Sequence, residues 1–504
     1  MNKNILTLTT LFKHNPMKKA VLVLDCGATN VKACLVDTTG QILTSQSMPN
    51  QTIPDPYYPG GLIWDIDAIW RKLAICSKKA CEPGGNIEIT ALTVTTFGVD
   101  GAAMKKDGTI CYPVISWQCK RTEKIEKVID TYVDPKMLYR ITGLKSYHFN
   151  TINKLIWLKE NHPEVLTEMD YYVLLPSIIL HKITGEFVTD TTMAGTTMLT
   201  DLRTRQFSKS LLSAIGLDNE IFPNLTEPGT IIGKTTSEAS ETLGIRPGTL
   251  VVTTGHDTQY AVLGSGAGIN QPVLSSGTWE ILMARTYSAT LDMPPYNSEV
   301  TIELDAEAGL VDIGIQWVAS GVLEWISRLF YPGIEQSNQL YSTMICEALA
   351  IQAGSDGVSM LPELFPGGFM GDRGIIRGLT HSVTRAHFYR AALEALAYYT
   401  RYGLEKLQLA GKFSVKDILC VGGGSKNKLW NQIRADVLGI PVKSIDMKET
   451  TALGAALVAF TSAGVYKNIQ EAMESMATHF DIFDPGINSV QYNDLYKLYI
   501  SHTK

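Results

Sequence analysis

The sequence has no pair of cysteines at the CxxC spacing of a zinc site. Its eight cysteines are scattered between Cys26 and Cys420, a pattern that fits free thiols in a reducing compartment. No apolar stretch reaches the ~18 residues that a membrane-spanning helix needs. The opening segment, MNKNILTLTTLFKHNP, has a broken apolar run and no clear cleavage site of small residues, so it makes a poor signal peptide. We therefore expect a cytoplasmic protein with a disordered extension over residues 1–17 and no membrane partner.

A surplus of positive charge is also missing. The chain has 44 lysines and arginines against 50 aspartates and glutamates, which gives a net charge of −6. A face that tracks nucleic-acid phosphates needs the opposite balance, so we expect no nucleic-acid partner. Polar low-complexity tracts are absent too, and hydrophobic residues make up 45% of the 504 residues. This length and composition predict two large domains or three ordinary ones.

Two segments far apart in the chain show the same hairpin pattern. Residues 20–36, AVLVLDCGATNVKACLV, place two apolar, strand-forming runs on either side of a short polar turn. Residues 272–285, PVLSSGTWEILMAR, repeat the pattern, and LSSGT echoes LDCGAT. The repetition indicates a duplicated fold. Strand-forming runs also alternate with helical patterns, such as those of residues 152–164 and 386–407, and this alternation predicts α/β domains.

Small residues build the turns of both hairpins. Backbone N–H groups in such turns can approach phosphate oxygens without a side-chain clash. The first turn consists of Gly27, Ala28, Thr29 and Asn30, with Lys32 close behind as a source of positive charge. Asp25, just before the turn, can hold a metal ion through water. Each feature alone also fits an ordinary hairpin with a turn-forming aspartate, but the echo at Ser276, Gly277 and Thr278 favours phosphate binding.

Two predicted strand ends carry acidic residues. Residues 253–259, TTGHDTQ, follow an apolar run and place His256 and Asp257 where a strand ends. Side chains at such ends point into clefts, where a carboxylate can accept the proton of an attacking hydroxyl. Residues 95–102, TTFGVDGA, form a matching end, at which Asp100 can bond sugar hydroxyls. Both aspartates also fit plain turns.

Glycine-rich stretches elsewhere give weaker signals. Residues 422–425, GGGS, precede a helical pattern, so a flat ring can lie against the backbone there while Ser425 caps the helix. Residues 229–235, GTIIGKT, are one residue short of a phosphate-binding P-loop. Residues 264–268, GSGAG, place the third glycine one position early for the dinucleotide fingerprint. This mismatch removes the main argument for a nucleotide-dependent dehydrogenase.

The order of these motifs resembles that of the FGGY carbohydrate kinases of the actin-like ATPase superfamily. The residues that carry the resemblance are LDCGATNVKA, TTFGVDGA, GHDTQ, LSSGTWE and VGGGSKNKLWNQI, and it extends over about residues 19–490. It implies two duplicated RNase H-like α/β domains, over residues 18–253 and 254–490, with a nucleotide cleft between them. The hinge would lie near residues 253–256, and residues 491–504 would form a tail.

The resemblance also implies a role for individual residues. Asp257 would be the base that activates the sugar hydroxyl, and Asp25 would serve Mg²⁺. The phosphates of ATP would be held by Gly27, Ala28, Thr29, Asn30, Lys32, Gly277 and Thr278, and the adenosine by Gly423, Gly424 and Asn427. The substrate side would comprise Val99, Asp100, Trp117, Arg121 and His256. One position departs from the family, because Cys119 stands in WQCKR where many members have an aspartate.

Within the family, the sequence is most similar to the members that act on L-fuculose. The expected reaction converts ATP and L-fuculose into ADP and L-fuculose 1-phosphate. Relatives that act on L-rhamnulose, D-ribulose or D-xylulose remain alternatives, as does a nucleotide-dependent sugar sensor without turnover. Dimers are common in this family, so a homodimer is possible.

Overall fold

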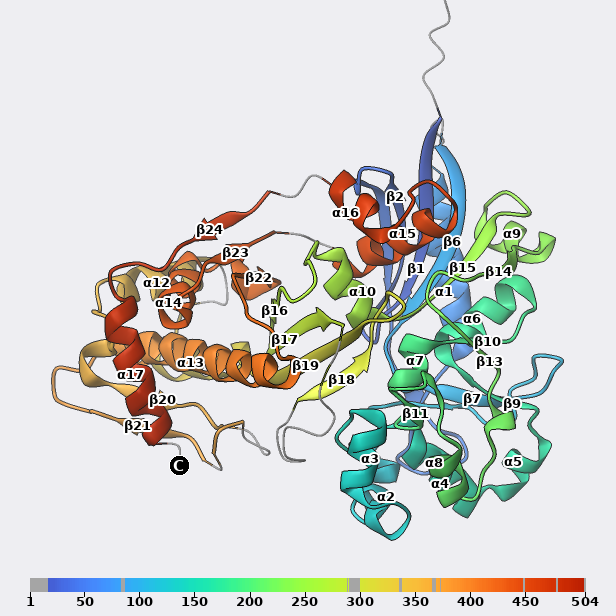
Figure 1. Cartoon of the computed structure of the whole chain (residues 1–504), viewed down its shortest axis with the longest axis horizontal. Coiled ribbons are helices and arrows are strands. Elements are labelled where there is room, and N and C mark those ends of the chain that lie inside the picture. The colour runs from blue at the N-terminus through green and yellow to red at the C-terminus, as the bar shows by residue number, and fades with distance from the viewer. Residues whose placement is uncertain are drawn as a thin grey trace, which may run out of the picture.

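The computed structural model describes residues 17–82, 87–287, 289, 300–334, 338–364, 369–371, 373–446, 449–476 and 479–502. The extension expected over residues 1–17 lies outside this part of the chain, apart from Met17. Two mixed sheets with helices packed on them form two domains that lie side by side (Figure 1). None of the helices in the described part has both the length and the apolar composition of a membrane span.

The first sheet has six strands in the order β14-β15-β6-β1-β2-β3. These are β14 (Ile231–Lys234), β15 (Leu250–His256), β6 (Ile87–Thr96), β1 (Lys18–Cys26), β2 (Asn30–Asp37) and β3 (Ile42–Pro49). β1 and β2 pair antiparallel, so the first predicted hairpin is confirmed. β1, β6 and β15 are parallel, and their last residues, Cys26, Thr96 and His256, lie in register. The loops that follow these three strands therefore meet at one edge of the sheet.

The second sheet repeats this topology and confirms the duplication. Its order is β18-β19-β17-β16-β22-β23-β24. The strands are β18 (Thr301–Leu304), β19 (Val311–Val318), β17 (Trp279–Thr286), β16 (Val273–Ser276), β22 (Ile418–Val421), β23 (Val442–Ser444) and β24 (Asp481–Phe483). The antiparallel hairpin β16–β17 matches β1–β2, and the parallel strands β22 and β23 match β6 and β15. The sheets differ by the extra edge strand β18.

Alternating residues of β1 pack against opposite layers of helices. Leu22 and Leu24 share a core with α1 (Ile66–Cys81), α6 (Leu175–Thr184) and α9 (Ser237–Leu243). Val21 and Val23 instead pack with α15 (Thr450–Ser462). α15 is covalently part of the second half of the chain but covers the first sheet (Figure 1). The two halves of the chain are thus interlocked rather than separate.

Helix α10 (Asp257–Gly264) lies between the two sheets (Figure 1). Tyr260 and Leu263 pack into the core of the first sheet, and Val262 packs against the second sheet. A side chain at Gly264 would collide with the backbone of α15, so these two helices cross in direct contact. A residue at the start of α10 is consequently held by both domains.

The helices of the second domain pack on the other face of its sheet. α13 (Arg385–Gly411), α11 (Ser320–Phe330), α14 (Lys428–Leu438) and α17 (Ser489–Ser501) share one core with it. The segment predicted as a tail over residues 491–504 is largely α17, which packs on this domain. Tyr492, Tyr496 and Tyr499 are buried there at helical spacing, and they bind the segment to the domain.

Shorter elements complete both domains. The helices are α2 (Glu123–Glu126), α3 (Pro135–Thr142), α4 (Thr151–Asn161), α5 (Pro163–Glu168), α7 (Thr191–Gly195), α8 (Lys209–Ala214), α12 (Asn338–Leu349) and α16 (Ile469–Ser475). The strands are β4 (Ile53–Pro54), β5 (Leu62–Trp64), β7 (Gly101–Met104), β8 (Val114–Ile115), β9 (Tyr171–Leu174), β10 (Val188–Asp190), β11 (Thr200–Asp201), β12 (Gln206–Phe207), β13 (Asn224–Thr226), β20 (Ser359–Leu361) and β21 (Ile375–Arg377). The helical pattern of residues 152–164 is thus confirmed, with a break before Pro163.

Candidate active site

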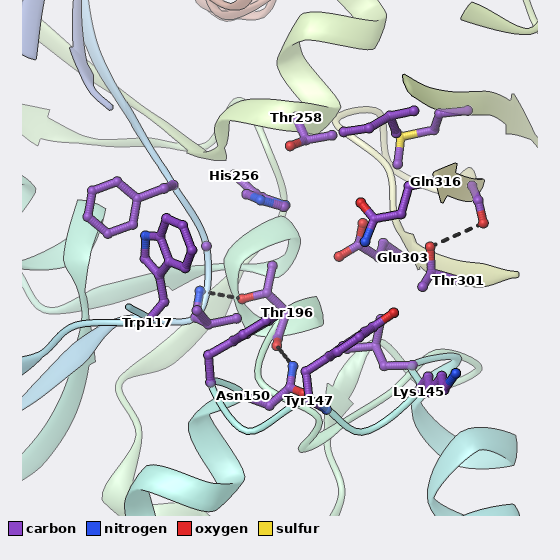
Figure 2. A pocket seen from close by; sticks show the side chains of 18 of the residues that line it. Trp117, Lys145, Tyr147, Asn150, Thr196, His256, Thr258, Thr301, Glu303 and Gln316 are labelled. Carbon is purple, nitrogen blue, oxygen red and sulfur yellow. Dashed lines mark hydrogen bonds between the residues drawn. The ribbon is translucent and has the colours of Figure 1, made fainter. Parts of the chain in front are cut away.

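A cavity of about 280 Å³ opens between the two domains (Figure 2). Loops of the first domain form one wall, which contains Phe97, Gly98, Val99, Trp117, Leu144, Lys145, Tyr147, Phe149, Asn150 and Thr196. Strands of the second domain form the other, which contains Ile281, Met283, Thr301, Glu303, Gly314, Ile315 and Gln316. His256 and Thr258 lie where the walls meet. Apolar surfaces with a few polar groups and a size for one small molecule are typical of a substrate pocket.

A second cavity of about 220 Å³ adjoins the first. The two have Thr258, Ile281 and Met283 in common as lining residues. The second is also bordered by Asp257 and by Thr450 and Thr451 at the start of α15. Asp257 lines only the second cavity, but its chain neighbours His256 and Thr258 line the first, so it lies close to both spaces.

Asp257 has the electrostatic character of a base near neutrality. It is the first residue of α10, and its side chain keeps 29% of its surface exposed. Thr258 Oγ1 donates a hydrogen bond of 3.3 Å to Asp257 Oδ1, but burial outweighs this bond and raises the pKa of Asp257 to about 6. The neighbouring His256 has a lowered pKa because it is buried, so it is mainly neutral at pH 7. A carboxylate with such a pKa can take up a proton during a reaction near neutral pH.

Asp25 is a second buried carboxylate at the same sheet edge. Burial, and after it the negative charge of Asp257, raises the pKa of Asp25 to about 7, although Lys32 and a hydrogen bond from Thr95 act in the opposite direction. In the described part of the chain, no group of three or more metal-ligating side chains occurs. The single carboxylate of Asp25 fits Mg²⁺, which uses one or two carboxylates together with phosphates and water.

The first predicted phosphate turn lies next to the start of α15. Asn50 fixes the turn, since its side-chain amide donates to the Gly27 carbonyl at 2.9 Å. Lys32 is not free, because Glu449 binds its ammonium group at 2.8 Å. Glu449 precedes α15, whose first residues line the second cavity. The turn and this helix end are thereby joined across the domain boundary.

The second predicted turn touches the glycine-rich segment. A side chain at Gly424 would collide with Ser276 Oγ, and Gly422 has the left-handed φ of +86° that favours glycine. These glycines let the two turns approach closely. Asn427, not Ser425, caps α14, because its side chain accepts a hydrogen bond of 3.1 Å from the Trp430 N–H.

The residues predicted on the substrate side divide into two groups. Val99, Trp117 and His256 line the first cavity, whereas Asp100 and Arg121 do not. Asp100 is fully buried and binds Lys154, the Trp64 indole at 2.7 Å and the Trp117 N–H at 3.1 Å. The structure does not bring its carboxylate into the cavity. Asp100 instead links two turns, because it directly follows Val99 and accepts the hydrogen bond from the Trp117 N–H.

Arg121 is also buried and held by other side chains, outside the lining of the first cavity. Its guanidinium bonds Asp55 at 2.6 Å and stacks on Tyr58 and Trp157. Its Nε donates to Cys119 Sγ at 3.1 Å. The cysteine that departs from the family pattern is thus buried against Arg121 and does not line the cavity.

The polar residues Glu303 and Gln316 on the second-domain wall were not predicted from the sequence. Glu303 and Gln316 face His256 and Thr196 across the cavity (Figure 2). Gln259 of α10 donates to Glu303 Oε2 at 2.9 Å, so this glutamate is positioned relative to the helix of Asp257. The only local signal is that Glu303 interrupts the buried residues Ile302 and Leu304 of β18.

Comparison with known proteins decides the family. The model of the N-terminal domain of the FGGY family of carbohydrate kinases matches residues 20–264, and that of the C-terminal domain matches residues 273–463. The chain belongs to the FGGY family of carbohydrate kinases. The lining residues of both cavities lie within these two matches, as do both sheets apart from β24 and the first two residues of β1.

Individual members of the family are similar over nearly the whole chain. An L-fuculokinase of Escherichia coli K12 is 42% identical over 93% of this chain and 98% of its own length. An L-fuculokinase of Haemophilus influenzae is 41% identical over 90% of this chain and 97% of its own. The crystal structure of xylulose kinase from Rhodospirillum rubrum has a TM-score of 0.87 at 22% identity, over 96% of this chain and 98% of that one. This FGGY kinase is therefore an ATP-using sugar kinase with the predicted duplicated actin-like fold.

Proposed function

We propose that the protein phosphorylates L-fuculose at its C1 hydroxyl, producing L-fuculose 1-phosphate and ADP from ATP. The observation that carries the proposal is the position of Asp257, which lines the second cavity between two residues, His256 and Thr258, that line the first. Burial raises its pKa to about 6. The similarity to L-fuculokinases at 41–42% identity favours L-fuculose as the acceptor.

In this proposal the sugar occupies the first cavity and Asp257 acts as the general base. Its carboxylate accepts the proton of the C1 hydroxyl while that oxygen attacks the γ-phosphorus, and ADP leaves on the opposite side. His256, Val99 and Trp117 form the first-domain side of the acceptor site. Glu303 and Gln316 add hydrogen-bonding groups from the second domain, so the acceptor contacts both domains. Closure around the sugar excludes water, which would otherwise compete as the phosphoryl acceptor.

The nucleotide occupies the second cavity and the turns around it. The backbone of Gly27–Asn30 and of Gly277–Thr278 contacts the phosphates, and Gly423, Gly424 and Asn427 border the adenosine. Lys32 acts mainly by joining the first turn to Glu449. Asp25 would hold Mg²⁺, and the bound ion would neutralise charge on the phosphates.

The cysteines and the net charge bear on the cellular location and the partners of the protein. All eight cysteines are free thiols, which supports a reducing, cytoplasmic location. The net charge of −6 supports small-molecule partners rather than nucleic acid.

The family resemblance also suggests a homodimer. Light scattering during size-exclusion chromatography tests this, and the mass of a monomer would contradict it.

Identification of the product tests the proposed reaction. The protein is incubated with Mg·ATP and L-fuculose, the products are followed by ³¹P NMR, and ADP is quantified. One sugar phosphate bearing phosphorus on C1 is expected for each ADP formed. ADP release without a sugar phosphate would contradict the assignment. Binding of both ligands without any ADP would instead favour a sensor that has kept the fold.

A further inference from the structure

A buried ion pair lies beneath the two second-domain turns. Glu280 is the second residue of β17, directly after the turn at Gly277, and Arg434 lies in α14, which follows the glycine-rich segment. Both side chains have no exposed surface, and their charged groups are in direct contact. Neither residue lines either cavity.

The pair fixes the side chain of Ser276, the residue before Gly277. Arg434 Nη2 donates to Ser276 Oγ at 3.0 Å, and this hydroxyl donates to Glu280 Oε1 at 2.7 Å. The second carboxylate oxygen of Glu280 accepts a hydrogen bond of 2.9 Å from the Trp317 indole. Ser276 thus has a single orientation that satisfies both charged groups.

The other side of Arg434 reaches the glycine-rich segment. Its Nη1 donates to Asn431 Oδ1 at 2.9 Å, and the Asn431 amide donates to the Ser425 carbonyl at 2.6 Å. The guanidinium also stacks 3.6 Å above the Trp430 ring, which limits its rotation. One arginine therefore connects the ends of both turns through one intermediate side chain on each side.

The contact between the turns explains why this connection matters. An added Cβ at Gly422 would lie 2.7 Å from the Ser276 carbonyl, and one at Gly424 would collide with Ser276 Oγ. The position of Ser276 therefore determines how far apart the backbones of Gly277 and Gly424 lie. A buried ion pair is a poor source of stability compared with apolar residues of similar size, so its geometry is the more informative property.

We propose that Glu280 and Arg434 are positioning residues for the nucleotide, which hold the phosphate turn and the adenosine turn at the separation that binds ATP. The inference rests on the proposed function for the assignment of these two turns to ATP. It does not depend on which sugar accepts the phosphoryl group.

The test removes both charges together, so that no unpaired charge stays buried. In the double variant Glu280→Gln/Arg434→Gln, ATP affinity measured by calorimetry is expected to fall at least tenfold, while the KM for L-fuculose stays within about twofold. Ser276→Ala provides a milder second variant, because it keeps the ion pair and removes only its link to the turn. Its ATP affinity is expected to fall about threefold or more.

A second buried pair offers a matched control. Arg285 lies five residues after Glu280 on the same strand, roughly 17 Å away at ~3.4 Å per residue, and binds Asp305 at 2.8 Å. The variant Arg285→Gln/Asp305→Asn is expected to lose thermal stability but to bind ATP like the parent.

The outcomes separate positioning from plain stability. ATP affinity within twofold of the parent in the folded double variant, or in Ser276→Ala should the double variant not fold, would overturn the inference. Equal weakening in the control pair would also overturn it. Since ATP binding is measured directly, a parent protein that binds ATP but phosphorylates no sugar would refute the proposed function and leave this test intact.

Discussion

The negative charge of Asp257 adds to burial in raising the pKa of Asp25 to about 7. Asp25 is the residue before the last of β1, and Asp257 directly follows the last residue of β15. Both strands run parallel to β6 and end at the same edge of the first sheet. In the proposed reaction they have different tasks, because Asp25 serves the metal ion and Asp257 takes the proton of the sugar. Their titration and substitution are therefore the most direct probes of the site.

Replacing Asp257 by Asn should nearly abolish turnover while both ligands stay bound within a few fold. The amide has almost the same size and can still hydrogen-bond the sugar, but it cannot accept the hydroxyl proton. Loss of a general base costs about 10² to 10⁴ in rate. ADP release gives kcat, and calorimetry with ATP and L-fuculose gives the affinities. A turn-forming aspartate would tolerate Asn, so activity within about threefold of the parent would remove Asp257 from the mechanism.

The pH profile should show the raised pKa of Asp257. The base must be ionised to act, so lowering the pH through about 6 protonates it and reduces kcat/KM, by about tenfold for each further pH unit. The measurement is kcat/KM for L-fuculose between pH 4.5 and 8 at saturating Mg·ATP. An acidic limb centred near the ordinary carboxyl pKa of ~4 would contradict the role given to burial.

Replacing Asp25 by Asn should stabilise the ligand-free protein at pH 8. The folded-state pKa of about 7 exceeds the ordinary value of 3.8, so the contribution of the protonated carboxyl is fully present below pH ~4 and is lost as the pH rises through 7. Asn removes the cost of ionisation, worth about 2–4 kcal/mol at pH 8. Thermal unfolding in EDTA at pH 4.5 and pH 8 measures the difference. Destabilisation at both pH values would contradict the shift.

Replacing Gly277 by Val should weaken ATP binding far more than sugar binding. A Cβ at Gly277 would meet only the Trp279 carbonyl, at 3.5 Å, so the fold has room for a small side chain. The branched side chain of valine would instead occupy the space of the phosphates. Gly277→Ala serves as the matched control and should have a smaller effect. Equal loss of both affinities in Gly277→Val would show that this turn does not hold phosphate.

Replacing Glu303 by Gln should raise the KM for L-fuculose about tenfold or more, because hydrogen bonds to a charged group are worth ~1.5–3 kcal/mol. The KM for ATP should not change. Glu307→Gln is a comparable substitution in the same segment that lies outside the cavity, and it should leave both constants near those of the parent. An unchanged KM for L-fuculose in Glu303→Gln would place the acceptor elsewhere.

Local patterns were enough to predict the hairpins, their duplication and the position of Asp257. Strand alternation and small turns depend on near neighbours, so β1–β2 and β16–β17 were visible in the sequence. The tyrosines of α17 also repeat at helical spacing, a local pattern that indicates a helix in the segment predicted as a tail.

Contacts between residues distant in the chain determine the features that local sequence patterns did not predict. Asp100 and Arg121 turn away from the cavity because Lys154 and Asp55, distant in the chain, bind them. Glu303 lines the cavity only because the two domains meet there. The packing of α15 on the first sheet is likewise a contact between the two halves of the chain, so no local sequence pattern predicts it.

A coupled ADP-release screen with L-fuculose, L-rhamnulose, D-ribulose, D-xylulose and glycerol tests both the kinase activity and its acceptor. We expect L-fuculose to have the highest kcat/KM and Asp257→Asn to remove the signal with every acceptor. A kcat/KM more than about tenfold higher for another acceptor, a gap of roughly 1.4 kcal/mol, would contradict the substrate assignment. Absence of ADP release with every acceptor would contradict the kinase activity itself.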